Sequence, residues 1–280
     1  MADTNKKHRI VFDVRRQPGF SSVAIGCFIL LYLPIILLVI YSFNAGNSLS
    51  VWQGFSLKWY AVAWENEAVQ AATFRSLIIA ACASAVSTAA AVMAALATTR
   101  AGPFKGDALV VAMINQPLMI PEVVTAVAVL LFFAMIKAAI GYTGLWYLII
   151  AHSAFCIPFA YMPIRARLQG MDLSLEQAGA DLYGTPGRVF RYVTLPLLWP
   201  GILAGSMLAF VISLDNVVTT EFVKSAGQDT LPTYMLGQIR RATTPELNAI
   251  STALLAISVV LVIAFYFLST KSTIKQGEDK

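Results

Sequence analysis

The sequence has 280 residues, of which 58% are hydrophobic and only 12% are charged, and its mean hydropathy is +0.70. A soluble domain carries about a quarter charged residues, so this composition excludes a protein that faces water on all sides. The net charge of +5 comes from basic residues placed between apolar runs, which excludes a nucleic-acid-binding protein and indicates orientation in a membrane.

A spanning helix needs about 20 mainly apolar residues, and six stretches meet this requirement, so we predict an all-α polytopic membrane protein. The second stretch is rich in alanine, and we expect it inside the bundle because small residues let helices approach closely. The third contains Pro117 and Pro121, which free backbone carbonyls and bend a helix, so we expect it to line an aqueous cavity. The predicted spans are 20–42, 75–99, 108–136, 145–165, 197–221 and 249–269.

The distribution of basic residues predicts the orientation. With six spans both termini lie on one side of the membrane, and that side holds 14 Lys and Arg residues against 6 on the other. The richer side should be cytoplasmic. We therefore expect a cytoplasmic tail (1–19), one transmembrane domain (20–270) and a second cytoplasmic tail (271–280), in a chain surrounded by membrane lipid.

The segment 173–196, between the fourth and fifth spans, has an ordered pattern. It predicts a short helix over 172–183, started by a capping Asp172 or Ser174, and then a turn at 184–187. A second amphipathic segment follows and ends as the fifth span begins at Leu195-Pro196. A rigid cytoplasmic knob for docking is one interpretation, and an ordinary surface loop or interfacial helix is the other.

This segment resembles the signature loop of ABC importer permeases, in which a Glu-Ala-Ala triplet is followed by a glycine and a Leu-Pro pair. In register with Leu195-Pro196, the triplet falls on Gln177-Ala178-Gly179 and the family glycine on Tyr183, while Glu176 comes one residue early and Gly184 one late. Asp181 and Val193 fit the pattern. The resemblance implies contacts with an ATP-hydrolysing subunit from Glu176, Gln177, Ala178, Gly179, Asp181, Tyr183 and Gly184.

Further segments resemble the spermidine/putrescine subgroup of these permeases, among them 52–60, 151–159, 213–218 and 245–249. The resemblance implies the type I ABC importer permease fold in a bacterial inner membrane. It also implies four partners: two ATP-binding subunits, a second homologous permease and an external solute-binding protein. ATP and Mg²⁺ would bind the ATP-binding subunits, and no cofactor is expected in this chain.

Ionisable residues inside the spans are the candidates for contact with cargo, because each costs about 2.5–3.5 kcal/mol on insertion scales. Glu122 falls in the third span beside the two prolines, Asp215 in the outer third of the fifth, and Glu221 near its external end. Asn216 stands where the polyamine-type pattern often has a second acid. A structural role is the alternative for each acid. Asp215 would be a partner for a helix-capping amide or a basic side chain, Glu122 would satisfy the proline-broken backbone, and Glu221 would be neutralised by water or Lys224.

Metal and catalytic sites are not expected. The three cysteines, Cys27, Cys82 and Cys156, lie inside apolar runs and are interpreted as small buried packing residues. His152 is interpreted as a hydrogen-bonded core residue. Because the sequence contains no Gly-x-x-x-x-Gly-Lys-Ser/Thr loop, nucleotide must bind elsewhere.

The sequence therefore predicts a permease that is not itself an enzyme and that imports a small organic solute, most consistent with a polyamine or related amine. The alternative is a secondary transporter or channel subunit working alone, which requires an inverted repeat that we do not find. An integral membrane enzyme is rejected because the chain has only two histidines.

Overall fold

The computed structural model describes residues 20–48, 51–100, 102, 105–141, 144–241 and 244–278. The predicted N-terminal tail, 1–19, lies outside the described residues. Six helical stretches of the described chain are long and apolar enough to cross a membrane, which confirms the predicted fold class. In chain order the helices are α1 Phe20–Tyr41, α2 Lys58–Glu65, α3 Glu67–Arg100, α4 Asp107–Met119, α5 Glu122–Ile140, α6 Leu145–Gln169, α7 Leu173–Asp181, α8 Pro186–Val189, α9 Leu195–Asp215, α10 Val218–Val223, α11 Leu231–Arg241 and α12 Pro245–Glu278.

Four predicted spans correspond to α1, α3, α6 and α12, with differences at the ends. Helix α3 begins at Glu67, whereas the predicted span begins at 75. The prediction missed the first turns because they carry polar residues, which lower the hydropathy. Helix α12 continues to Glu278. The predicted C-terminal tail, 271–280, is therefore part of this helix as far as the chain is described.

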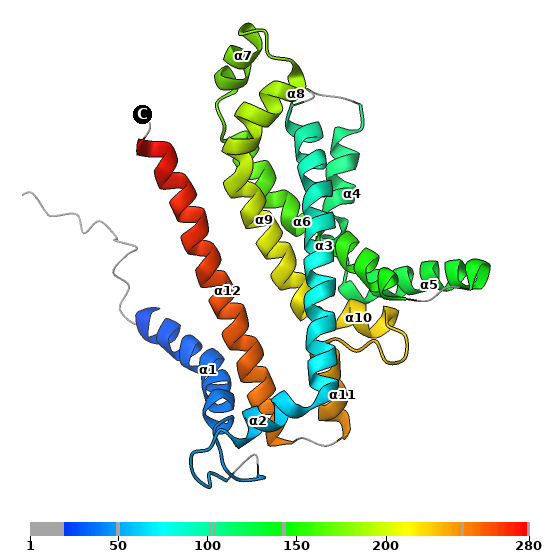
Figure 1. Ribbon diagram of the computed structural model, residues 1–280, viewed down its shortest axis with the longest axis vertical. Coiled ribbons are helices and arrows are strands. Elements are labelled where there is room, and N and C mark those ends of the chain that lie inside the picture. Colours follow the sequence, from blue (N-terminus) through cyan, green and yellow to red (C-terminus); the bar gives the residue numbers. More distant parts are fainter. Residues whose placement is uncertain are drawn as a thin grey trace, which may run out of the picture.

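The prediction of one bent helix over 108–136 was wrong, because two helices, α4 and α5, replace it. Helix α4 ends at Met119, and the backbone of the next residue, Ile120, is extended (φ −101°, ψ 140°). A residue before proline is disfavoured in the helical region, and Pro121 has no N–H to continue the ladder, so the helix stops here. Figure 1 shows α4 running beside α3, while α5 projects away from the bundle.

The fifth span was also predicted with the wrong ends, 197–221. The helix instead runs continuously over Pro186–Asp215, and Glu221 lies in the separate α10. Its early part includes a π-helical turn, Phe190–Thr194, after which the Leu195 N–H bonds to the Phe190 carbonyl. Such a turn absorbs the missing N–H of Pro196 without ending the helix, so the amphipathic segment and the span form one rod.

The core lies among α3, α6 and α9, which run alongside one another in Figure 1. Helix α3 contributes mainly small residues to it, which confirms that the alanine-rich span is interior. The buried alanines of α3 are Ala72, Ala80, Ala83, Ala91 and Ala95.

Helix α1 has the opposite environment. None of the residues in its apolar stretch is buried by the rest of the chain. Cys27 is therefore exposed on α1, and its interpretation as a buried residue was wrong, whereas Cys156 is buried in the core. An apolar helix without internal cover requires lipid or another subunit as its surroundings.

Three small residues at helical spacing, Gly201, Gly205 and Ala209, allow α9 to approach α6 closely. A Cβ atom at Gly201 would lie 2.7 Å from the Cβ of Arg167, and one at Gly205 would lie 2.7 Å from the carbonyl oxygen of Ala160. These distances are too short for a side chain, so the two helices meet almost backbone to backbone.

We predict that Gly205→Ala destabilises the chain by about 1–3 kcal/mol, the usual cost of overpacking, because its new methyl group meets a backbone atom that cannot rotate away. Gly26→Ala is the control, since no atom lies within 4 Å of a Cβ built there. Thermal unfolding of the purified chain in detergent measures both. Equal melting temperatures for the two variants would contradict the close approach of α6 and α9.

Candidate functional site

The segment predicted as a docking knob forms α7 and α8, at the end of the bundle opposite α2 and α11 (Figure 1). Helix α7 begins after Asp172, whose carboxylate accepts a hydrogen bond from the Ser174 N–H at 2.9 Å. This bond stabilises the charged carboxylate and lowers the pKa of Asp172. The predicted cap and the short helix are thus both present.

Helix α7 ends in a Schellman motif. The Gly184 N–H bonds to the Gly179 carbonyl at 3.2 Å, and the Tyr183 N–H bonds to the Ala180 carbonyl at 2.9 Å. The motif places Tyr183 in the left-handed region, with φ +59°. Glycine normally occupies this position, because a residue with a Cβ pays about 1–2 kcal/mol for that conformation.

Glycine is required at 184, where α7 folds back on α8, but not at 179. A Cβ at Gly184 would lie 2.5 Å from the Gly179 carbonyl oxygen, so only glycine fits there. A Cβ at Gly179 would meet Val189 at 3.4 Å and Val193 at 3.5 Å. Packing therefore explains the glycine at 184, whereas the contacts at 179 are ordinary van der Waals distances that a side chain tolerates.

Glu176 is engaged within the chain. The Arg100 Nε lies 3.1 Å from each oxygen of the Glu176 carboxylate, and the Arg100 Nη2 donates to the Leu168 carbonyl at 3.1 Å. Arg100 is the last residue of α3, so one guanidinium joins the ends of α3 and α6 to α7. By contrast, the side chains of Gln177, Ala178, Asp181 and Tyr183 are exposed.

Three of the four predicted cargo-pathway residues, Glu122, Asp215 and Asn216, line one cavity of about 340 Å³. The rings of Phe155 and Phe159 also line it, with centroids 5.6 Å apart. No basic side chain is among the described residues around this cavity. Sequence reasoning missed the two phenylalanines, although their spacing of one helical turn on α6 was a usable signal.

Hydrogen bonds hold the Glu122 carboxylate, at the start of α5, against the junction between α9 and α10. Its Oε1 accepts from the Asn216 amide at 2.7 Å and from the Thr219 hydroxyl at 3.3 Å. The Asn216 side chain also accepts from the Thr219 N–H at 2.9 Å, which fixes the start of α10. The side chain of Asp215, at the end of α9, forms no hydrogen bond or ion pair within the described part of the chain, so its carboxylate is available to a ligand.

His152 is the core residue that its sequence context predicted. Its ring is buried, with Nδ1 2.8 Å from the Ser213 hydroxyl and Nε2 2.9 Å from the Thr220 hydroxyl. The Thr220 hydroxyl donates in turn to the Asn216 carbonyl at 2.8 Å. This chain of bonds links α6, α9 and α10 directly behind the acidic cavity.

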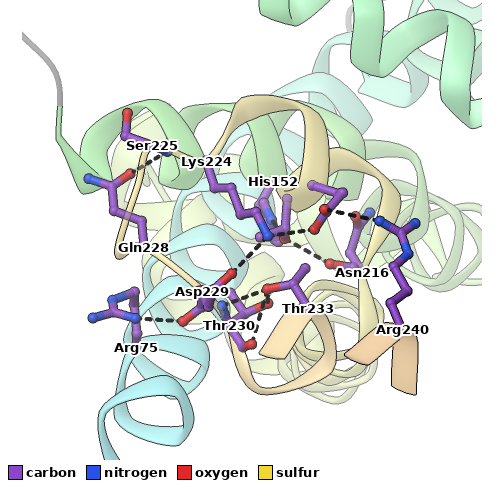
Figure 2. Close-up of polar contacts among 12 residues, drawn as sticks. Arg75, His152, Asn216, Lys224, Ser225, Gln228, Asp229, Thr230, Thr233 and Arg240 are labelled. Carbon is purple, nitrogen blue, oxygen red and sulfur yellow. Dashed lines mark hydrogen bonds and ion pairs between the residues drawn. The ribbon is translucent and has the colours of Figure 1, made fainter. Parts of the chain in front are cut away.

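Glu221 lies apart from the acidic cavity, in an ion-pair network near α11. Figure 2 shows Lys224, Asp229 and Arg240 of this network. Lys224 Nζ is 2.6 Å from Glu221 and 2.7 Å from Asp229, and Arg240 is 3.9 Å from Glu221. Arg75 donates to the Asp229 carbonyl at 2.6 Å. The assignment of Glu221 to the cargo pathway stays a prediction, and its contacts are those of the structural alternative.

The network has a predicted pH dependence. Burial lowers the pKa of Lys224, but its bonds to Asp229 and Glu221 outweigh this and raise the pKa above its ordinary value of 10.5. The bonds that raise the pKa of Lys224 stabilise the fold fully below pH 10.5. This stabilisation is lost as the pH rises through the folded-state pKa and the lysine loses its charge. We expect Lys224→Met to lower the melting temperature by about 2–4 °C at pH 8 and by less near pH 11. If the difference in melting temperature between wild type and Lys224→Met grew toward high pH, the ion pairs of Lys224 would not be what stabilises the fold.

Comparison with known proteins identifies the family. The chain matches the family described as "Binding-protein-dependent transport system inner membrane component" over residues 87–272. It is 37% identical over 260 residues to the putrescine transport system permease protein PotI of Escherichia coli K12, covering 91% of this chain and 92% of that one. It is 34% identical over 242 residues to the spermidine/putrescine permease PotC of Haemophilus influenzae, covering 86% and 93%.

Solved structures agree on the fold. A bacterial ABC transporter for import of the acidic polysaccharide alginate superposes with a TM-score of 0.68 at 15% identity, covering 89% of this chain and 93% of that one. The inward-facing MetNI methionine ABC transporter gives 0.59 at 16% identity, covering 72% and 94%. The fold, the family match and the related sequences agree, and the chain belongs to the binding-protein-dependent transport system inner membrane component family, as a multi-pass permease of an ABC importer.

Proposed function

We propose that this permease carries a small organic cation, a polyamine or a related amine, through the acidic cavity lined by Glu122, Asp215 and Asn216. The observation that supports this most strongly is the pairing of two carboxylates with two phenylalanine rings in one cavity. Carboxylates attract an ammonium group, and aromatic faces attract it further by cation–π interaction. The aliphatic part of an amine packs against the same rings.

The position of Glu122 supports a cationic cargo despite the amide at 216. In the related pattern two acids are often adjacent, and here the second of them is Asn216. The Asn216 amide instead binds the Glu122 carboxylate at 2.7 Å, which brings a second acid into the cavity from another helix. The cavity thus has two carboxylates, as a cargo with more than one ammonium group requires.

The permease works with partners in this proposal: two ATP-binding subunits, a second permease and an external solute-binding protein. ATP and Mg²⁺ bind the ATP-binding subunits, and this chain carries no cofactor and catalyses no reaction. Both termini lie on the cytoplasmic side of a bacterial inner membrane. The apolar surfaces of α1 and α5, of which 0% and 11% are buried within the chain, face lipid or the second permease.

The loop 173–196 couples the ATP-binding subunits to the cavity. Gln177, Ala178, Asp181 and Tyr183 present the exposed face. Glu176 and Gly184 set the shape of the loop, and the Gly179 carbonyl accepts the Gly184 N–H. The helix that begins at Pro186 beside α7 ends at Asp215 in the acidic cavity. Closure of the ATP-binding subunits, acting on α7 and α8, therefore moves a wall of the cavity through one continuous rod, and hydrolysis resets it.

The cargo proposal predicts the effect of removing charge from the cavity. Asp215→Asn and Glu122→Gln keep shape but each remove one carboxylate, so we expect uptake of putrescine or spermidine to fall about tenfold, a loss of about 1.4 kcal/mol. Uptake is measured in vesicles containing the whole importer, at saturating solute-binding protein. Glu67→Gln, an exposed acid at the start of α3, is the control. Uptake equal to wild type in both cavity variants would exclude this cavity as the cation path.

The coupling proposal predicts the effect of reversing a charge on the exposed face of α7. We expect Asp181→Lys to reduce cargo-stimulated ATP hydrolysis about tenfold or more, because an unmatched charge at an interface is costly to bury. Lys105→Glu, in the loop between α3 and α4, is the matched control. Unchanged stimulation by Asp181→Lys would remove the loop from the coupling path, and uptake without ATP would favour the stand-alone transporter.

A further inference from the structure

Tyr183 is the one described residue other than glycine that has a positive φ. It occupies the position of the Schellman motif at which a glycine would fit without strain. The two backbone bonds of the motif do not depend on the side chain, since they run from the N–H groups of Tyr183 and Gly184. The fold of α7 therefore does not require a tyrosine here.

Nothing within the described chain compensates for this conformation. The Tyr183 side chain is 95% exposed, and none of its described neighbours forms a hydrogen bond or ring contact with it. The preceding Leu182 is 83% exposed. Together the two residues form an apolar tip on a turn that two backbone hydrogen bonds hold. Strained residues of this kind cluster at functional sites.

The surroundings of the tip indicate a protein partner on the cytoplasmic side. Figure 1 shows α7 beyond the end of α3, away from the stretch that lipid would cover. Exposed Asp181 and Arg188 flank the tip, and charged groups so placed oppose entry into hydrocarbon. Tyrosine is enriched among residues that dominate protein interfaces, because its ring fills an apolar pocket while its hydroxyl meets a polar rim.

We propose that Tyr183 anchors the permease in an apolar pocket with a polar rim on the ATP-binding subunit, and that this anchor selects which ATP-binding subunit the permease accepts. The proposal rests on the coupling role of the loop 173–196 and adds a specificity determinant to it. A partner shaped for a loop with glycine at this position has no pocket for the ring, so it clashes with Tyr183.

The test uses Tyr183→Gly, which removes the ring and relieves the backbone at the same time. We expect the purified variant to melt at the same or a higher temperature than wild type. We expect its affinity for the ATP-binding subunit of its own importer to fall about tenfold or more, and cargo-stimulated hydrolysis to fall with it. Tyr183→Phe should keep most of the affinity. Trp64→Ala, which removes an aromatic ring that is 78% exposed on α2, is the control.

Specificity is measured with the ATP-binding subunit of an importer whose permeases have glycine at this position. Tyr183→Gly should bind that subunit better than wild type does. If Tyr183→Gly bound its own ATP-binding subunit with wild-type affinity, the proposal would be overturned. A loss of affinity in lipid nanodiscs but not in detergent would also overturn it, because the ring would then be a lipid contact. If Asp181→Lys uncouples the importer while Tyr183→Gly does not, the coupling role stands and only the anchor fails. If neither has an effect, both fail.

Discussion

The close contact between α9 and α6 is the constraint on which the rest of the structure depends. Because Gly201 and Gly205 have no side chains, the two helices meet at backbone distance, and the buried residues of α3 close the third side. In lipid there is no hydrophobic effect to hold helices together, so close packing of this kind provides much of the stability. The break before α5 and the loop before α9 are tolerated around this fixed core.

The residue types along the chain were sufficient to predict the number of spans, the interior place of the alanine-rich helix and the short helix α7. They were not sufficient to place the ends of the third and fifth spans, since both depend on how a proline is accommodated. At Pro121 the chain leaves the helix, whereas at Pro196 a π-helical turn keeps the helix intact. Hydropathy measures how apolar a stretch is and not how its backbone bonds are made, so it cannot distinguish a break from a π-helical turn.

The candidate site was likewise predictable from the sequence only in part. The sequence was sufficient to single out Glu122 and Asp215, because ionisable residues in apolar stretches are costly and usually have a function. That they share a cavity depends on the break at Pro121, which directs α5 toward α10, and on the bond between Glu122 and Asn216. The inward direction of Glu176 depends on Arg100, a residue far away in the chain that no local pattern connects to the loop.

The continuous helix from Pro186 to Asp215 has a mechanical consequence. In the proposed coupling the rod turns about its close contact with α6, and at 1.5 Å per residue its arms measured from Gly205 extend about 28 Å to Pro186 and about 15 Å to Asp215. A sideways displacement at the loop then reaches the cavity in the opposite direction and at roughly half the amplitude. In the coupling proposed above, the position of this glycine contact along the helix sets the ratio of the two displacements. Moving that glycine by one or two turns would change the ratio without altering either end.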